Sequence, residues 1–290
     1  MKVLLTGAAG QLGEALQRSR PGSVVELRAL TRQELDLADP EACRRAVAEY
    51  RPDWLINAGA YTAVDRAEAE PELAQAVNAA APAAFAEALQ ASGGRLLQVS
   101  TDFVFNGAQG SPYQPHQPVQ PLGVYGATKA AGEAAAAAAL DPERLCILRT
   151  SWVYGPVGKN FLLTMLRLHR EREQLRVVAD QVGCPTATPG LAAACWASIE
   201  QGLCGRHHWS DAGAASWYDF AVAIGELGVT AGLLPRAAAV EPIPTAEYPT
   251  PAQRPSYSLL DCTATRAALQ LQPEHWRWAL QRVMASLKGA

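Results

Sequence analysis

The sequence has 290 residues, enough for a full hydrophobic core and two lobes, because single domains usually contain about 100–200 residues. Its hydrophobic fraction of 49% and charged fraction of 18% are those of an ordinary globular protein. The formal net charge is -3 and no basic run is present, which excludes nucleic acid and anionic membranes as expected partners. We therefore expect a small-molecule substrate.

Cysteine usage and the N-terminal residues bear on the compartment. The six cysteines are scattered without a Cys-x-x-Cys pair, and the chain begins with a strand pattern instead of a signal segment. No apolar run is long enough to span a membrane. We expect free thiols and a cytoplasmic protein. The histidines lack ligand spacing with thiols or carboxylates, so no metal site is predicted from them.

The N-terminal region has the pattern of a strand, a glycine loop and a helix. Residues 2–6 form an aliphatic run, Gly7, Gly10 and Gly13 follow, and residues 14–19 are helical in character. Glycines let the backbone turn tightly and approach a pyrophosphate, whose charge then lies at the positive end of a helix. This order predicts a dinucleotide site, and the glycine spacing resembles that of short-chain dehydrogenase/reductases.

A second strand is predicted over residues 24–30. In many NAD-binding proteins it carries an acidic residue that binds the ribose diol, but here Thr31 and Arg32 follow it. Without a carboxylate to repel a 2′-phosphate, and with a guanidinium nearby, the sequence favours NADPH and leaves NADH as the alternative. Asp36 and Leu37 occupy positions that contact adenine in this superfamily, and helix capping is an equal alternative for Asp36.

Further alternation of strands and helices predicts an α/β fold, a Rossmann-like doubly wound parallel sheet. A continuous amphipathic helix is expected over residues 71–91, and a surface excursion rich in Pro, Gly and Gln over residues 106–123. The remaining strands of the sheet are expected over residues 52–57, 95–100 and 145–149.

The alternation of strands and helices ends after residue 150, where a loop over residues 151–155 is followed by mainly helical patterns. Six prolines between residues 235 and 255 exclude a sheet interior and predict a wrapping loop. We expect a Rossmann domain over residues 1–150, with some later segments packing back on it, and a smaller substrate-binding lobe over residues 151–290. The helices expected there cover residues 161–172, 189–200 and 217–227, with a short strand over residues 175–178.

The catalytic candidates are Tyr125, Lys129 and Thr101. Tyr125 and Lys129 are four residues apart in a predicted helix, so both side chains lie on one face. The charge of Lys129 should lower the pKa of Tyr125 from about 10 toward neutral pH, which suits proton transfer to or from a sugar oxygen. Thr101, at the carboxyl end of a strand, would hold that oxygen. This spacing is also common on solvated helix faces, so the assignment depends on the glycine loop nearby.

Taken together, these motifs resemble the extended short-chain dehydrogenase/reductases and, among them, the dTDP-4-dehydrorhamnose reductases. The resemblance implies that a nicotinamide hydride reduces the C4 ketone of dTDP-4-dehydro-L-rhamnose. It also implies that Tyr125 gives the proton, Lys129 holds the nicotinamide ribose and Thr101 binds the reacting oxygen. Besides the glycine loop and Tyr125-x-x-x-Lys129, it rests on residues 57–65, 100–105, 149–155, 158–161 and 249–255.

The resemblance also completes the expected site. Arg254 would bind the substrate diphosphate because a guanidinium fork suits phosphate oxygens, with a surface salt bridge as the alternative. The expected substrate residues are Thr101, Asp102, Trp152, Asn160 and Arg254. The expected cofactor residues are Gly7, Gly10, Gln11, Leu12, Gly13, Thr31, Arg32, Asp36, Leu37, Ala60, Tyr61, Thr62, Tyr125 and Lys129.

The chain departs from its relatives in two places. Relatives are described as using Mg²⁺, in some cases at a glutamate-lined dimer contact, but here Ala15 follows Glu14. A metal-bridged dimer is therefore not expected, Mg²⁺ enters only by analogy, and either a monomer or a homodimer fits. Gln253 stands where relatives commonly carry Arg, which removes a positive charge beside Arg254.

Other functions share this fold. NDP-sugar dehydratases commonly place Asp-Glu directly after the Thr, whereas this chain has Asp102 and Phe103. An epimerase would hold NAD tightly through its cycle. A non-catalytic subunit that binds a synthetase is a third alternative, because one branch of the family has that role, but the intact Thr101, Tyr125 and Lys129 argue against it.

Overall fold

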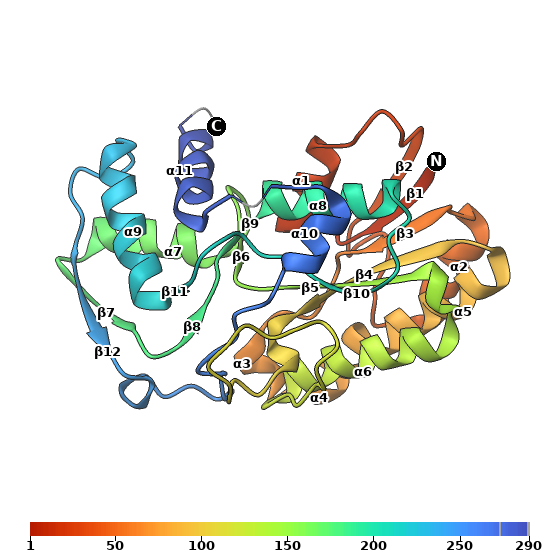
Figure 1. Ribbon diagram of the computed structural model, residues 1–290, viewed down its shortest axis with the longest axis horizontal. Helices are drawn as coiled ribbons and strands as arrows, with labels where there is room; N and C mark the ends of the chain where they lie inside the picture. The colour runs from red at the N-terminus through yellow and green to blue at the C-terminus, as the bar shows by residue number, and fades with distance from the viewer. Residues whose placement is uncertain (273, 289–290) are drawn as a thin grey trace.

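The computed structural model describes residues 1–272 and 274–288. The chain forms a larger and a smaller lobe, which lie side by side in Figure 1. Within the described chain, the larger lobe contains a six-stranded sheet in the order β10-β5-β4-β3-β1-β2, with parallel neighbours. Its strands are β1 (Lys2–Thr6), β2 (Glu26–Leu30), β3 (Trp54–Asn57), β4 (Arg95–Thr101), β5 (Leu145–Thr150) and β10 (Gly205–His208).

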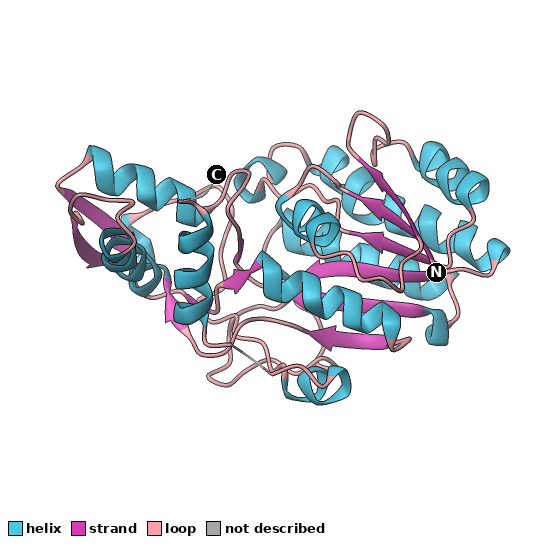
Figure 2. Cartoon of the chain, turned by 90° about the horizontal axis from the view of Figure 1, so that it is seen from above, coloured by secondary structure: helices cyan, strands magenta, loops and turns pink. Residues whose placement is uncertain are grey.

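Helices cover both faces of this sheet, as Figure 2 shows. The inner strands β3 and β5 are buried along their whole length, which is typical of a parallel sheet between helical layers. One apolar cluster joins the sheet to α1 and α8, and another joins it to α2, α5 and α6. The predicted doubly wound fold is therefore confirmed. The helices are α1 (Gln11–Arg18), α2 (Pro40–Tyr50), α3 (Val64–Ala67), α5 (Ala81–Ser92), α6 (Val124–Ala139) and α8 (Thr188–Glu200).

The helix predicted over residues 71–91 is interrupted by a wider turn. It consists of α4 (Pro71–Gln75), the π-helical turn η1 (Ala76–Ala80) and α5. An α-helix would direct the amide hydrogen of residue 82 to the carbonyl of Asn78, and Pro82 has no such hydrogen. The helix widens at this point, as π-turns do at functional sites.

The smaller lobe packs helices against a short pair of strands. The helices α7 (Phe161–Glu171), α9 (Trp217–Thr230) and α11 (Trp276–Ser286) share one apolar core with β7 (Gln174–Val178). Three segments of the C-terminal half belong to the larger lobe instead, because β10 pairs with β5, α8 packs on α1, and Leu269 at the end of α10 (Thr263–Leu269) joins the same apolar cluster. The other elements are β6 (Val153–Tyr154), β8 (Val182–Gly183), β9 (Thr186–Ala187), β11 (Ala215–Ser216) and β12 (Ala239–Ile243), with 3-10 turns at Asp102–Val104, Pro142–Arg144 and Thr245–Glu247.

Two loop predictions were wrong in part. The proline-rich segment contains β12, which pairs in parallel with β7 and includes Pro242. The sheet tolerates this proline because β12 pairs only with β7 in the described chain, so its other edge needs no donor. The loop predicted over residues 151–155 contains β6, which pairs with β9.

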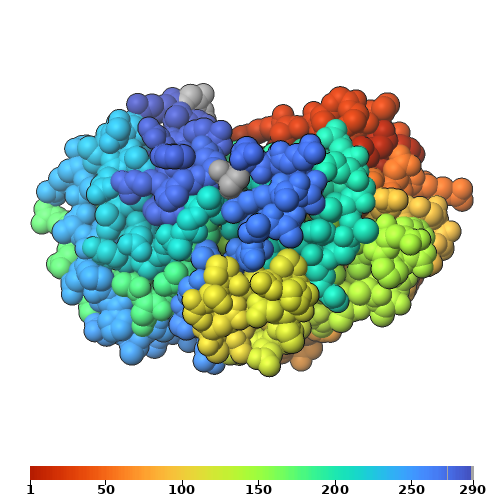
Figure 3. All heavy atoms as spheres, viewed as in Figure 1, coloured from red at the N-terminus to blue at the C-terminus, as the bar shows by residue number. Residues whose placement is uncertain are grey.

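The segment over residues 106–123 is irregular and lies on the surface. Figure 3 shows it as a yellow patch against blue C-terminal chain. Tyr113 anchors it, because its backbone bridges to Leu260 and its ring stacks on Phe105 at 4.2 Å. As for membrane spans, the described helices include none with the length and apolar character needed to cross a bilayer.

The close approach of α6 to η1 gives a testable consequence. A Cβ at Gly132 would lie 2.0 Å from the backbone oxygen of Asn78. We expect Gly132→Ala to lower the free energy of unfolding by about 1–3 kcal/mol, measured by urea denaturation, because neither helix can move freely. Gly110→Ala is the control, since its added Cβ meets nothing within 4 Å. Equal stability of the two variants would contradict the tight contact.

Candidate active site

The glycine loop follows β1 and leads into α1. Gly7 has φ +68°, and a Cβ there would lie 2.8 Å from the Cα of Gly59. A Cβ at Gly13 would lie 2.2 Å from the oxygen of Gly7. Gly10 is the N-cap of α1 and supplies no side-chain acceptor, which leaves the first amides of the helix available to an anion. The loop therefore has the form of a pyrophosphate cradle.

A buried hydrogen-bond chain fixes the carboxyl ends of the central strands. Thr6 Oγ1 donates to Asn57 Oδ1 (2.6 Å), and Asn57 Nδ2 donates to Gln98 Oε1 (2.8 Å). Gln98 Nε2 in turn donates to the Val99 carbonyl (2.9 Å). Thr6 Oγ1 also accepts the backbone amide of Gly59 (3.2 Å). The loop that begins at Asn57 is thereby held against the glycine loop.

Asn78 in the π-helical turn links this loop to α6. Its Oδ1 accepts the amide of Tyr61 (2.9 Å), and its Nδ2 donates to the Tyr61 carbonyl (3.1 Å) and to Thr128 Oγ1 (3.2 Å). Sequence reasoning treated this helix as packing and missed Asn78. The signal in the sequence is one asparagine within an alanine-rich stretch, four residues before Pro82.

Tyr125 and Lys129 lie in the first two turns of α6. Glu68 Oε1 accepts the amide of Val124 (2.8 Å), so a carboxylate from the residue after α3 caps the helix next to Tyr125. Sequence reasoning missed this role of Glu68. The ring of Tyr125 packs edge-on against Phe103 with centroids 5.6 Å apart. Lys129 is buried, and its Nζ donates to the Val99 carbonyl (2.7 Å).

The expected effect of Lys129 on Tyr125 is wrong in this structure. Burial raises the pKa of Tyr125 to about 12, nearby Asp102 adds to the rise, and a hydrogen bond with Thr101 opposes it. Burial also lowers the pKa of Lys129 to about 8, with Glu133 acting in the opposite sense. Loss of hydration is the largest cause of both shifts, and no charge interaction between the two side chains contributes to either. Tyr125 is therefore a protonated phenol at neutral pH, which is the form of a proton donor.

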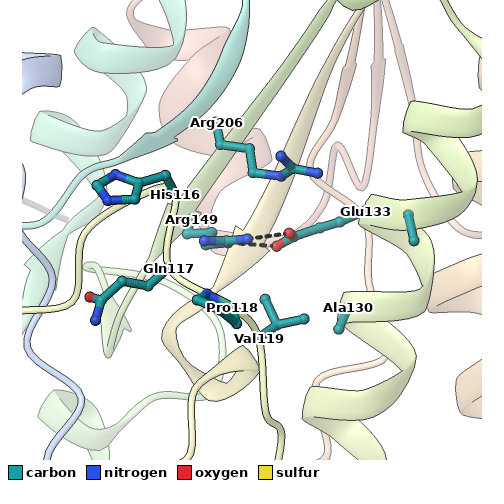
Figure 4. A pocket seen from close by; sticks show the side chains of 9 residues that line it. His116, Gln117, Pro118, Val119, Ala130, Glu133, Arg149 and Arg206 are labelled. Atoms are coloured by element: carbon teal, nitrogen blue, oxygen red, sulfur yellow. Dashed lines mark hydrogen bonds and ion pairs between the residues drawn. The ribbon is translucent and has the colours of Figure 1, made fainter. Parts of the chain in front are cut away.

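A buried ion pair continues the same face of α6. Glu133 accepts from Arg149 Nη2 (2.6 Å) and Nε (2.9 Å), and from Ser100 Oγ (2.5 Å). Figure 4 shows the two side chains meeting beside a cavity of about 260 Å³, with the Arg206 guanidinium close to the pair. Tyr125 and Lys129 do not line that cavity. The ion pair ties α6 to the strands that carry Thr101 and Arg149.

Thr101 is the last residue of β4, Asp102 follows it, and both are buried. Thr101 Oγ1 accepts the amide of Phe103 (3.2 Å) and donates to Asp102 Oδ1 (3.1 Å). Asp102 Oδ2 has no hydrogen-bond partner among the described residues. Burial raises the pKa of Asp102 to about 6, against opposing effects of the Ser258 and Thr101 hydroxyls. Asp102 thus has an unused acceptor next to the predicted catalytic pair.

At the adenosine end, one premise of the cofactor prediction was wrong. The carboxylate of Glu34 accepts both the amide and the hydroxyl of Thr31, each at 2.8 Å. A carboxylate therefore does lie at the end of β2, three residues later than the usual position. Arg32 is exposed and forms no ion pair within the described part of the chain.

Asp36 and Leu37 follow at the same end of the sheet. The helix cap considered for Asp36 is provided by Asp39, which accepts the first amides of α2. Asp36 closes a turn instead, by accepting the amide of Ala38 (3.0 Å). Leu37 is buried, and its side chain lies directly beneath Gly59. Asp36 is exposed, so its carboxylate remains accessible to a ligand.

The expected substrate residues in the smaller lobe fall into separate places. A cavity of about 490 Å³ is lined by Phe161, Trp217 and Arg254, among others, but not by Trp152 or Asn160. Trp152 has φ +45° and stacks on Trp217 with centroids 3.6 Å apart. It therefore supports the cavity from behind its aromatic wall.

Arg254 forms a salt bridge, which was the alternative to a diphosphate contact. Its two terminal nitrogens donate to the carboxylate of Asp65 at 3.0 and 2.9 Å, and Arg254 also contacts Thr250 and the Ala252 carbonyl. Asp65 belongs to α3 of the larger lobe, so the pair joins the two lobes. The Arg254 side chain still lines the 490 Å³ cavity.

No group of three or more His, Cys, Asp or Glu residues within the described ranges could hold a metal ion. The six cysteines are free, as expected, and Cys204 is the exposed one. Burial raises the pKa of the Cys146 thiol to about 12, so it is unreactive at neutral pH.

Comparison with known proteins decides the family. The model described as RmlD substrate binding domain matches residues 1–288. A dTDP-4-dehydrorhamnose reductase from Burkholderia thailandensis is 41% identical, with 97% of each chain covered. The chain belongs to the dTDP-4-dehydrorhamnose reductase family.

Solved structures of this family agree with the fold. A crystal structure of a dTDP-4-dehydrorhamnose reductase from Clostridium acetobutylicum has a TM-score of 0.93 and 36% identity, and covers 99% of this chain and 100% of its own. The corresponding protein of Bacillus anthracis, solved in complex with NADP, has a TM-score of 0.91 with the same identity and coverage. Neither lobe is therefore an addition to the reductase fold.

The raised pKa of Asp102 predicts a pH-dependent change in stability. The carboxyl is protonated more readily in the folded protein, about 6 against 3.8, so its favourable contribution is present at low pH and is lost as pH rises through 6. When the pH is raised from 4.5 to 7.5, the free energy of unfolding of Asp102→Asn should therefore increase by about 1–3 kcal/mol relative to that of the native protein. Thermal unfolding at the two pH values measures this.

Asp261 provides the control for this experiment. The amide and hydroxyl of Thr263 hold the pKa of Asp261 below its usual range. Asp261→Asn should therefore show no such gain at higher pH. If the difference in the free energy of unfolding between Asp102→Asn and the native protein does not change with pH, the pKa of the buried Asp102 carboxyl is not raised.

Proposed function

We propose that this protein is an NADPH-dependent reductase that converts the C4 ketone of dTDP-4-dehydro-L-rhamnose to dTDP-L-rhamnose. One observation carries the proposal: a half-buried Tyr125 whose phenol stays protonated at neutral pH beside Thr101, on the helix that also buries Lys129. Ketone reduction needs a proton donor at the new alkoxide, and this group fits. The NADP complex of the Bacillus anthracis relative supports the choice of cofactor.

The residues present fit a bound dinucleotide. A Cβ at Gly7 or Gly13 would fill the turn before α1, so the loop leaves room for a pyrophosphate at the helix start. Gly10, Gln11 and Leu12 would bind it there. NADPH supplies the hydride when bound. Ala60, Tyr61 and Thr62 lie on the loop held by Asn78 and would border the inner half of the cofactor.

The proton is handled by the chain's own groups. Tyr125 donates its phenolic proton to the sugar oxygen, and Thr101 hydrogen-bonds that oxygen as its charge develops. The phenolate left behind is stabilised by the Lys129 ammonium, which is still mostly charged at neutral pH because its pKa is about 8. Lys129 would also bind the nicotinamide ribose, and Asp102 would contact the sugar nucleotide.

The 490 Å³ cavity is our assignment for the nucleotide part of the substrate. Phe161 and Trp217 offer aromatic faces against which a thymine ring can stack, and their centroids lie 4.7 Å apart. Arg172, Arg176 and Arg254 line the same cavity and suit a diphosphate. The smaller lobe would thus bind the sugar nucleotide while the larger lobe binds the cofactor.

The alternative functions are less well supported. Phe103 occupies the place where dehydratases commonly have a glutamate, so the elimination lacks its second group. Family membership favours a reductase over an epimerase. A non-catalytic subunit would not need Tyr125 and Lys129 in this arrangement. The oligomeric state, a role for Mg²⁺ and a cytoplasmic location stay predictions.

Tyr125→Phe tests the proposed proton donor. The variant keeps the ring contact with Phe103 but has no proton to give, so the chemical step should slow by about 10²-fold or more. Single-turnover oxidation of NADPH with dTDP-4-dehydro-L-rhamnose measures this, and NADPH binding should be retained. Near-normal turnover would remove Tyr125 from its role.

Glu34→Gln tests the adenosine end. Because the Glu34 carboxylate lies on Thr31, it opposes a 2′-phosphate, and its removal should raise the ratio of kcat/KM for NADPH over NADH by about two- to fivefold. Glu143→Gln makes the same charge change near the amino end of β5 and should leave the ratio unchanged. An unchanged ratio in Glu34→Gln would place Glu34 outside the cofactor site.

A further inference from the structure

Gln11 and Asn160 form a direct hydrogen bond between the lobes. Asn160 Nδ2 donates to Gln11 Oε1 at 2.8 Å, although the residues are 149 positions apart. Gln11 is the first residue of α1, where the cofactor pyrophosphate is proposed to lie. Asn160 is the N-cap of α7, which lines the 490 Å³ cavity. One bond therefore connects the starts of the two helices that border the two ligands.

The surroundings of this bond allow only one arrangement of the Asn160 amide. Its Oδ1 accepts the amide of Leu163 (3.0 Å), which caps α7. Its Nδ2 also donates to the carbonyls of Gly155 (3.0 Å) and Val157 (3.1 Å). Both polar atoms of Asn160 are thus satisfied by protein, so it is a poor candidate for a direct substrate contact. Its position instead fixes the segment that precedes α7.

That segment packs directly on Gln11. Gly158 has φ +74°, and a Cβ there would lie 3.1 Å from Gln11 Cγ. Gln11 Oε1 is occupied by Asn160, whereas Gln11 Nε2 has no hydrogen-bond partner among the described residues. The amide is therefore oriented with a free donor, which a phosphate oxygen can accept. An anion bound by Nε2 and the bond to Asn160 stabilise the same side-chain rotamer.

The second helix carries this orientation into the cavity. Phe161 follows Asn160 directly, lines the cavity and packs on Trp217. Met165 and Leu168, one and two turns further along α7, line it as well. A shift of the α7 cap therefore changes the shape of the cavity wall. The Gln11–Asn160 hydrogen bond therefore has one residue beside each proposed ligand.

We propose that the Gln11–Asn160 hydrogen bond couples the two binding sites, so that a dinucleotide at the glycine loop and a thymidine diphosphate in the smaller lobe each strengthen the binding of the other. Asn160 is a positioning residue in this scheme, acting through Gln11 and α7. The inference rests on the proposed function, which places the two ligands. Because coupling between binding sites is reciprocal, either ligand can report it.

The test is calorimetric titration of NADPH in the absence and presence of saturating dTDP, which cannot be turned over. In the native protein dTDP should tighten NADPH binding about fivefold or more. In Asn160→Ser that factor should fall to near 1. Serine is a good N-cap without charge, so α7 keeps its first hydrogen bond while Gln11 loses its partner. Affinity for each ligand alone should change much less than the coupling.

Two further variants complete the design. Gln11→Met removes the other end of the bond and should lose the same coupling factor, and the double variant with Asn160→Ser should lose no more than either alone. Thr164→Val is the matched control. It removes a hydroxyl that donates to the Asn160 carbonyl (2.8 Å) at the same helix start, and it leaves the interlobe bond intact. Its coupling should equal that of the native protein.

The outcomes separate the two claims. Native binding of both ligands without coupling, or unchanged coupling in Asn160→Ser and Gln11→Met, would overturn this inference and leave the proposed function standing. A native protein that binds neither NADPH nor dTDP would overturn both. Loss of coupling in Thr164→Val would show that any damage at the α7 cap has this effect, and would also overturn the assigned role of the bond.

Discussion

The candidate site depends on the loss of hydration of two groups at the start of α6, the half-buried Tyr125 phenol and the buried Lys129 ammonium. Loss of hydration moves the two pKa values apart, up to about 12 for Tyr125 and down to about 8 for Lys129. At neutral pH this leaves a proton on the phenol and a positive charge nearby. Reduction of a ketone requires both, because a proton must be given and the resulting phenolate must be stabilised.

The surrounding structure holds these groups through contacts that come from distant parts of the chain. Glu68 caps α6, Asn78 ties it to the loop after β3, and Glu133 pairs with Arg149 in the neighbouring strand. Gly132 permits the close approach to Asn78. The precision of the site thus comes from buried polar groups that satisfy one another, and not from the catalytic helix alone.

Much of the larger lobe was predictable because its signals are local. The glycine loop, the aliphatic strands and the i, i+4 pair of Tyr125 and Lys129 can each be recognised within a few residues of sequence. The π-helical turn was only partly predictable. The missing amide hydrogen of Pro82 is visible in the sequence, but the contact of Asn78 with α6 is not. Pro242 could not be placed, because its acceptability depends on which edge of β12 has a partner.

Errors at the site had one common cause. The sequence shows which charges are near one another along the chain, but not which are buried or already paired. The pKa of Tyr125 was expected to fall, and burial raises it. Glu34 was overlooked because it reaches Thr31 by a turn, and the bond of Asn160 to Gln11 across the lobes was not foreseen. Each depends on contacts that form only in the folded chain.

We propose that hydride from the cofactor and a proton from Tyr125 reduce a keto sugar bound between the two lobes. The most direct measurement is mass spectrometry of the product formed from dTDP-4-dehydro-L-rhamnose and NADPH deuterated at both C4 positions of the nicotinamide. We expect dTDP-L-rhamnose that carries one deuterium at sugar C4, with one NADPH consumed per product. A sugar product without deuterium, or turnover without net consumption of NADPH, would contradict it.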